Sequence, residues 1–178
     1  MSNRPLSNAS LTTSLRERLT LDEAKGEYRD GSIRYLVMRP DVLMGMFAVL
    51  PTERREEALE ALAQSALAFG GRSVKAYRDA GANDANELLR VIAETSSQLG
   101  WGRWTFSDGE DGRSLQLAIR NSPFAAGFGK SKTPVCHAVR GIFSALAPVV
   151  FGEQISVEET SCAAQGDSDS CHFLMRLS

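Results

Sequence analysis

Apolar and polar residues alternate strictly over residues 114–119, where every second side chain is Leu or Ile. A repeat of two residues is typical of a strand with one buried face. The aromatic-rich stretch 101–106 precedes it, and Asp108–Gly112 between the two stretches is rich in turn-forming Asp and Gly. We therefore predict a β-hairpin in this part of the chain.

A helical repeat dominates the residues before this hairpin. The pattern predicts a short strand at 33–37 and then helices at 41–50, 52–69 and 85–99. Asp41, Thr52 and Asn83-Asp84 are expected to cap these helices at their N-termini. Gly70-Gly71 is expected to end the second helix, and residues 74–77 are expected to add a further helical turn.

The most apolar helix candidate spans Pro134–Phe151, after a loop predicted at 125–132. Pro148 is expected to kink or end this helix. Its small residues would allow close approach of a neighbouring helix or a flat ligand; they are Ala138, Gly141, Ser144, Ala145 and Ala147. Two further strands are predicted at 154–159 and 171–177. The element order indicates an α+β fold with an antiparallel sheet and helices packed on one face.

Composition places this chain among ordinary globular proteins. It has 178 residues, 43% hydrophobic and 24% charged, with a net charge of -2. We expect a mobile arm at 1–24 and one domain at 25–178, long enough for a sizeable core. The mixed charges argue against nucleic-acid binding, and no apolar run approaches the length of a membrane span. No signal peptide is visible, so we expect a cytoplasmic protein with reduced cysteines.

All three cysteines lie in the last part of the chain, close to an acidic pair. Cys136 starts the predicted apolar helix, Cys162 and Cys171 flank the predicted turn between the last two strands, and Glu159 precedes Cys162 by three residues. Three thiolates and one carboxylate suit a closed tetrahedral Zn²⁺ site. The spacing is not Cys-x2-Cys, however, and free cysteines also pack as small apolar residues, so spacing alone leaves both interpretations open.

Four strings of residues resemble the V4R (4-vinyl reductase) domain family. They are Arg120–Phe124, Pro134–His137, Glu159–Gly166 and Cys171–Phe173. The family includes a small protein of bacteriochlorophyll biosynthesis and the sensor domains of activators that detect phenols and toluenes. Its fold is shared with small vesicle-tethering subunits and is related to haem-based nitric oxide sensors. The resemblance covers roughly residues 25–178 and implies a bacterial protein, often a homodimer, that encloses a pocket for a hydrophobic ligand.

The resemblance also implies a metal site. In the phenol-sensing branch a structural zinc is held by a Cys at the start of the long helix, a Glu three residues before a second Cys, and a third Cys beyond the turn. These roles fall on Cys136, Glu159, Cys162 and Cys171. Glu158 would be a substitute ligand. His137 and His172 are less favoured, because a histidine next to a cysteine on a helix or strand points elsewhere.

The family resemblance leads to a small-molecule-binding protein as the first hypothesis, with a bacteriochlorophyll precursor (a tetrapyrrole) as a possible ligand. The predicted ligand-binding residues are aromatic, with one cation; they are Trp101, Trp104, Phe106, Phe124, Phe128, Arg140 and Phe143. Plain core packing is the alternative for each of them. Arg140 needs a partner in its apolar helix, either a ligand carboxylate or an acid such as Glu94.

Two other functions remain open from the sequence. One is a stand-alone sensor or adaptor that acts through a dimer interface. The other is a 4-vinyl reductase, which is less favoured because no Gly-x-Gly-x-x-Gly follows a strand and Gly127–Lys132 lacks the Walker spacing. A Cys₃Glu site with no open position would be structural rather than catalytic. The phenol sensors' polar ligand contacts have no match here, so phenol sensing is not inferred.

Overall fold

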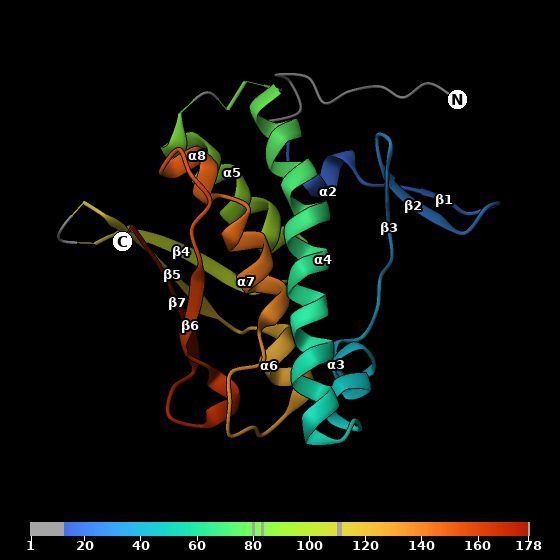
Figure 1. Ribbon diagram of the computed structural model, residues 1–178. Helices are drawn as coiled ribbons and strands as arrows, with labels where there is room; N and C mark the ends of the chain where they lie inside the picture. Colours follow the sequence, from blue (N-terminus) through green and yellow to red (C-terminus); the bar gives the residue numbers. More distant parts are fainter. Residues whose placement is uncertain (1–12, 80, 83, 110–111, 178) are drawn as a thin grey trace.

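A four-stranded antiparallel sheet forms one layer of the protein, with helices beside it (Figure 1). The computed structural model describes residues 13–79, 81–82, 84–109 and 112–177. The sheet contains β4 (Arg103–Asp108), β5 (Ser114–Arg120), β6 (Val157–Ser161) and β7 (Ser170–Arg176), in the order β4-β5-β7-β6. The helices cover one of its faces, so the predicted α+β class is confirmed.

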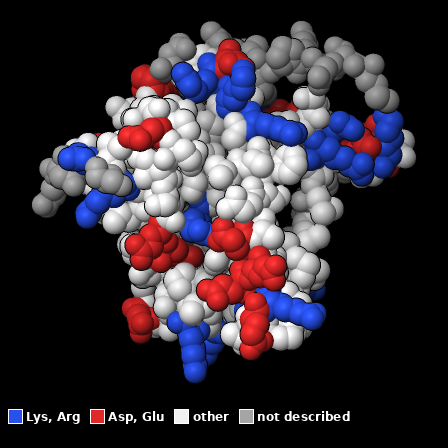
Figure 2. All heavy atoms as spheres, viewed as in Figure 1, with Lys and Arg blue, Asp and Glu red and all other residues white. Residues whose placement is uncertain are grey.

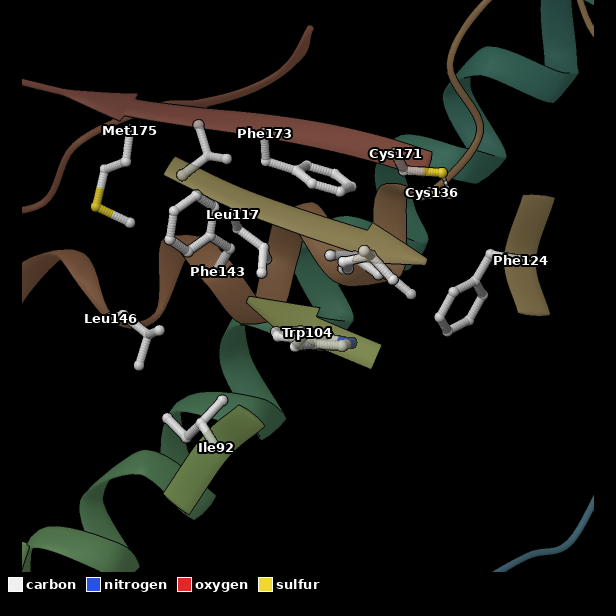
Figure 3. Packing of buried hydrophobic residues seen from close by; sticks show 14 of the residues in the cluster. Ile92, Trp104, Leu117, Phe124, Cys136, Phe143, Leu146, Cys171, Phe173 and Met175 are labelled. Carbon is white, nitrogen blue, oxygen red and sulfur yellow. Dashed lines mark hydrogen bonds between the residues drawn. The ribbon is translucent and has the colours of Figure 1, made fainter. Parts of the chain in front are cut away.

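The predicted alternation in β5 gives this sheet its buried face. Leu115, Leu117 and Ile119 are buried, and in the register they stand opposite Met175, Phe173 and Cys171 of β7. Trp104 of β4, opposite Ile119 in the register, belongs to the same face, and Figure 3 shows Phe143 and Leu146 from the helical layer beside it. The predicted β4–β5 hairpin is confirmed, although Glu110 and Asp111 of its turn lie outside the described residues.

Two helices pack side by side over this core. They are α4 (Thr52–Asp79) and α7 (His137–Ser144). A Cβ atom at Gly141 would lie 2.2 Å from the carbonyl oxygen of Ala63, so the two backbones are in direct contact there. Gly141, one of the small residues of the predicted apolar helix, therefore serves the approach of a neighbouring helix. A further helix, α5 (Ala85–Gln98), packs against β4 and is capped by Asp84 as predicted.

The end predicted for α4 at Gly70-Gly71 is wrong, because the helix continues to Asp79. A Cβ atom at Gly70 would lie 2.1 Å from Cδ1 of Ile142. Gly70 therefore makes room for a side chain of α7 within a continuous helix. Contact with another element explains this glycine better than a helix terminus does.

The single helix predicted over Pro134–Phe151 is also corrected. It is divided into α7 and the short α8 (Ala147–Val150). Pro148 has no N–H to donate to the carbonyl of Ser144 four residues earlier. That carbonyl instead accepts a hydrogen bond of 3.2 Å from the side chain of Gln154. The predicted effect of Pro148 is thus seen at the junction between the two helices.

A second, smaller antiparallel sheet lies beside the helices, away from the main sheet (Figure 1). It is formed by β1 (Thr20–Asp22), β2 (Glu27–Asp30) and β3 (Ile33–Tyr35). Within the expected arm, residues 1–12 lie outside the described residues, and α2 (Leu15–Arg18) and β1 occupy much of the remainder. Leu15 is buried, and its N–H donates to Oε1 of Gln98 at 2.5 Å.

Three local predictions are corrected around α3 (Pro40–Ala48) and α6 (Pro123–Phe128). The strand predicted at 33–37 stops at Tyr35. Asp41 is not the cap of α3, because Pro40 occupies the first turn and Arg39 is the N-cap residue. The loop predicted at 125–132 begins as α6, which Ser122 caps ahead of Pro123.

Acidic and basic side chains are unevenly distributed on the face shown in Figure 2. Acidic residues gather over its lower half, where the N-terminal half of α4 lies. Basic residues are more prominent toward the top and on the small sheet. Among the described residues, no helix is both long enough and apolar enough to cross a membrane.

Candidate metal centre and apolar cavity

Four buried side chains from three parts of the chain meet at one end of the sheet. Cys136 is the N-cap residue of α7, Glu159 lies on β6, Cys162 follows β6, and Cys171 lies on β7. One candidate ligand atom from each residue lies within 4.8 Å of the others, so that the four residues could hold one metal ion. Figure 3 shows Cys136 and Cys171 together beside the end of β5.

A β-bulge places Glu159 and Cys162 on the same side of the sheet. Residues three apart on a regular strand point to opposite faces. Between Glu159 and Ser161 the register shifts, because these residues, two apart on β6, pair with adjacent Phe173 and His172 on β7. The extra residue resets the alternation, and both side chains become buried.

The distances between the sulfur atoms match those of a tetrahedral thiolate site. The Sγ of Cys136 lies 3.8 Å from that of Cys162 and 3.6 Å from that of Cys171, and the last two are 3.9 Å apart. Thiolates at a Zn–S distance of about 2.3 Å are about 3.8 Å apart in a tetrahedron. All three cysteines are free, at separations far longer than a disulfide bond of about 2.05 Å.

Hydrogen-bond donors surround the cluster. The backbone N–H of Cys136 donates to Oε2 of Glu159 at 2.9 Å, and the N–H of Ala163 donates to Sγ of Cys171 at 3.3 Å. The hydroxyl of Ser122 lies 3.2 Å from Sγ of Cys136. Oε1 of Glu159 is buried without a hydrogen-bond partner in the described part of the chain. This unpaired oxygen is the kind of polar atom that a cation would satisfy.

The charges of the cluster also favour a cation. Burial, together with the neighbouring Cys162, raises the pKa of Glu159 to about 9. Hydrogen bonding with the thiols of Cys136 and Cys162 lowers the pKa of Cys171 to about 4. For Cys136, hydrogen bonds with Cys162 and Cys171, reinforced by burial, raise the pKa of the thiol far above its ordinary range. One thiolate is therefore favoured at the expense of its neighbours, and a divalent cation would allow all four groups to ionise together.

Three residues considered as substitute ligands lie outside the cluster. Glu158 is exposed on β6, and His172 is exposed on β7. His137 is the first residue of α7, where its Nδ1 lies 3.1 Å from the guanidinium of Arg140. The cluster therefore contains the four residues to which the family resemblance assigned the metal, and the identity of a bound metal stays a prediction.

An apolar cavity of about 750 Å³ lies at the start of α6. Most of its lining comes from α2, the β3–α3 connection, α3, the end of α5 and the start of α6. Trp101 and Phe124, two of the predicted ligand-binding residues, are in its wall, with ring centroids 5.0 Å apart and ring planes at 84°. Its size lies within the usual range of small-molecule pockets, about 300–1,000 Å³.

The other predicted ligand-binding residues do not line this cavity. Trp104 and Phe143 are buried in the core, and Phe106 packs between them, 6.1 Å and 5.9 Å away by ring centroids. Phe128 lies under the guanidinium of Arg55 at 5.7 Å. Arg140 forms an ion pair with Glu60, whereas Glu94, the partner suggested from the sequence, pairs with Arg90.

Sequence reasoning missed the part of the cavity wall that precedes α4. The missed apolar residues are Leu15, Leu19, Tyr35, Leu36, Val37, Met38, Pro40, Leu43 and Met44. A signal was present at Leu36-Val37-Met38, an apolar run in a connection rather than in a regular element. Leu36 and Val37 remain 77% and 73% exposed, which is unusual for adjacent large apolar residues.

Comparison with known proteins shows which proteins this α+β domain resembles. The sequence model of the V4R domain matches residues 115–177. The Bacteriochlorophyll synthase 23 kDa chain of Cereibacter sphaeroides is 32% identical over 94 residues. That alignment covers 50% of this chain and 41% of the relative, so the chain spans less than half the length of the curated relative it matches. The resemblance to the V4R family is thereby confirmed over residues 115–177.

Solved structures show the same fold at low sequence identity. The phenol-responsive sensory domain of the transcription activator PoxR, solved with phenol, has a TM-score of 0.74 and 17% identity, covering 91% of this chain and 86% of that one. A trafficking protein particle complex subunit 3 from Naegleria fowleri, covalently bound to palmitic acid, has a TM-score of 0.54 and 14% identity. The match covers 78% of this chain and 95% of that one. A vinyl-4-reductase family protein from Methanocaldococcus jannaschii has a TM-score of 0.51 and 16% identity. The match covers 81% of this chain and 84% of that one.

Proposed function

We propose that this domain binds a hydrophobic small molecule in the cavity beside α6 and carries a structural Zn²⁺ at the Cys136 cluster. The observation that carries the proposal is the cavity itself, about 750 Å³ in volume and lined mainly by apolar side chains. The rings of Trp101 and Phe124, packed edge to face, offer aromatic contacts in its wall. An apolar ligand would bury this wall and shield the exposed connection at Leu36 and Val37.

The donor set supports zinc as the metal. Cys136, Cys162 and Cys171 supply soft thiolate ligands, and Glu159 supplies the fourth. Four protein ligands would leave no open position, so the ion would hold structure rather than activate water. It would join the start of α7 to the β6–β7 connection and stabilise the sheet end next to α6. Because thiolate sites are maintained in reducing compartments, we also propose a cytoplasmic location in a bacterium.

A tetrapyrrole precursor of bacteriochlorophyll is the ligand that we propose first. The partial similarity to the Cereibacter sphaeroides chain supports this choice over other flat apolar molecules. The neighbours solved with phenol and with palmitic acid support ligand binding in this fold, at the level of fold alone. The function would be to carry or present the pigment, without a reaction at the metal.

The test is a titration of the zinc-loaded protein with protochlorophyllide. Trp101 lines the cavity and Trp104 is buried in the core, and these are the chain's two tryptophans. We expect protochlorophyllide to quench tryptophan emission and to change its own absorption spectrum, with a smaller loss of emission in Trp101→Phe. Unchanged emission and pigment spectra would contradict the tetrapyrrole proposal. Native mass spectrometry of protein from its own source would then identify any other retained ligand.

A stand-alone sensor or adaptor that acts as a homodimer is the second candidate. It is favoured by a row of exposed apolar side chains at the cavity mouth and along α3; they are Leu36, Val37, Met38, Val42, Met46 and Val49. Such a patch is typical of a protein–protein interface. Sedimentation analysis of wild type and a Val42→Lys/Met46→Lys variant tests it. A wild-type dimer that the variant converts to a monomer supports this candidate, and a wild-type monomer opposes it.

A further inference from the structure

Ser122 contacts the thiol cluster and caps the helix that contributes to the cavity wall. It is buried, and its hydroxyl oxygen lies 3.2 Å from Sγ of Cys136. It is also the N-cap residue of α6, where the hydroxyl oxygen accepts a hydrogen bond from the N–H of Ala125 at 3.4 Å. The next two residues, Pro123 and Phe124, line the cavity. A single side chain therefore joins a candidate metal ligand to the helix that forms part of the ligand wall.

The direction of the hydrogen bond between Ser122 and Cys136 follows from the chemistry. The oxygen of Ser122 already accepts from Ala125, which leaves its own hydrogen free to donate. A metal-bound cysteine is a thiolate and can only accept. Metal loading therefore fixes the hydroxyl as the donor to Cys136 and strengthens this bond, because one partner becomes charged.

The backbone before Ser122 is held in an uncommon conformation. Asn121 has a φ of 56°, the one positive φ of a non-glycine residue in the described part of the chain. A Cβ atom at Gly102 would lie 2.6 Å from the carbonyl oxygen of Arg120 and 3.0 Å from that of Asn121. The turn that presents Ser122 is thus packed directly against the residue that follows Trp101, whose ring lines the cavity. A left-handed asparagine at such a turn persists only where the surroundings hold it.

The far end of α6 is held just as closely. A Cβ atom at Gly127 would lie 2.4 Å from the carbonyl oxygen of Pro40 at the start of α3. Pro40, Leu43 and Met44 of α3 also line the cavity. A shift of α6 would therefore move the wall on two sides, through Phe124 directly and through α3 by contact.

We propose that Ser122 is a positioning residue that couples the metal centre to the cavity. When the metal is bound, Cys136 orients Ser122, Ser122 fixes the start of α6, and α6 sets the position of Phe124. Metal binding and ligand binding then strengthen each other, and thermodynamic linkage requires the two effects to be equal. The inference rests on the proposed function, because it needs both a metal at the cluster and a ligand in the cavity.

The experiment uses full-length protein loaded with Co²⁺, which occupies tetrahedral thiolate sites and has a sulfur-to-cobalt charge-transfer band. The apolar fluorophore N-phenylnaphthylamine serves as the cavity probe. Wild type is compared with three variants: Ser122→Ala removes the cap and the hydroxyl, Ser122→Gly keeps most of the capping preference without the hydroxyl, and Ser122→Thr keeps both. We expect the probe to shift the charge-transfer band in wild type and Ser122→Thr, and to leave it unchanged in the Ala and Gly variants.

The same variants give the size of the coupling. In wild type, saturating probe should tighten Zn²⁺ binding, measured by competition with a chelator, about fivefold or more. The Ala and Gly variants should lose this gain and bind the probe more weakly by a similar factor. If Ser122→Gly keeps both the band shift and the mutual gain, the proposal is overturned, because the hydroxyl is then not needed. Wild type that binds metal and probe independently also overturns it.

Failure of the proposed function gives a different result. Wild-type protein that takes up no Co²⁺, or that does not bind the probe, removes both the proposed function and the coupling. Wild-type protein that binds both, with no effect of one on the other, leaves the proposed function in place and removes the coupling alone. The charge-transfer band also separates the coupling from a purely structural effect of Ser122, because a loss of helix capping alone would not change the electronic state of the sulfur–metal bond.

Discussion

The backbone N–H of Cys136 donates a hydrogen bond of 2.9 Å to Oε2 of Glu159, a residue 23 positions later in the chain. This bond joins the start of α7 to β6 and fixes the carboxylate beside three thiols. The other oxygen, Oε1, is buried and has no hydrogen-bond partner among the described residues. One oxygen of this carboxylate thus has a structural role, and the other is available to bind a metal ion.

Replacing Glu159 by Gln should weaken metal binding while leaving the shape of the side chain intact. The amide keeps an oxygen for the N–H of Cys136, but it lacks the negative charge that a Zn²⁺ ligand provides. We expect at least about a tenfold higher Kd for Zn²⁺, measured by competition with a chromophoric chelator. Glu158→Gln is the matched control, because Glu158 is the adjacent acid and is exposed. Equal Kd values for the two variants would rule out Glu159 as a ligand.

Replacing Cys162 by Ser should lower both metal content and stability. Binding of a structural metal contributes directly to the free energy of unfolding, since the unfolded chain has no assembled site. We expect a loss of about 3 kcal/mol or more, equivalent to roughly 6–12 °C in Tm for a chain of this length. Elemental analysis and thermal unfolding measure the two effects.

A chelator provides the control for this variant. Excess EDTA should lower the Tm of wild type toward that of Cys162→Ser and should leave the variant unchanged, because its metal is already lost. Wild type purified with less than about half an equivalent of zinc, and with a Tm insensitive to EDTA, would show that the cluster is simply a set of buried thiols.

The residues of the thiol cluster could be named from the sequence because their types are rare and chemically specific. Cys136, Cys162 and Cys171 are all the cysteines of the chain, and a family resemblance assigned Glu159 to the same group. The β-bulge that turns Glu159 and Cys162 to the same side could not be read from the pattern. On a regular strand, two residues three positions apart point to opposite faces.

The cavity wall was harder to predict because aromatic residues serve the core and a pocket equally well. Trp101 and Phe124 line the cavity, whereas Trp104 and Phe143 are buried in the core. The difference depends on which elements meet around each ring, and this is set by tertiary contacts. Gly70 gave a similar ambiguity: the residue type indicated a helix end, while its function is contact with Ile142.

Replacing Gly141 by Ala should destabilise the protein even though alanine favours a helix. The added Cβ atom would lie 2.2 Å from the carbonyl oxygen of Ala63, which belongs to the backbone of α4 and cannot rotate away. We expect a loss of about 1–3 kcal/mol in the free energy of unfolding, measured by chemical denaturation. Gly45→Ala in α3 is the control, since nothing lies within 4 Å of its added Cβ atom, and it should gain about 0.5–1 kcal/mol. A neutral or stabilising Gly141→Ala would contradict the tight contact between α4 and α7.

Two exposed valines separate binding in the cavity from a general effect of surface charge. Val37 lines the cavity and is 73% exposed, while Val49 follows α3, is 83% exposed and lies outside the cavity lining. Val37→Asp would place a carboxylate where an apolar ligand must remove water, and desolvating an unpaired charge is costly.

We expect N-phenylnaphthylamine to bind Val37→Asp about tenfold more weakly than wild type and to bind Val49→Asp with unchanged affinity, both measured by fluorescence titration. Since both side chains are largely in water, neither variant should lose more than about 0.5 kcal/mol of stability. Equal loss of affinity in both variants would mean that the probe binds the exposed apolar surface of α3 and not the cavity.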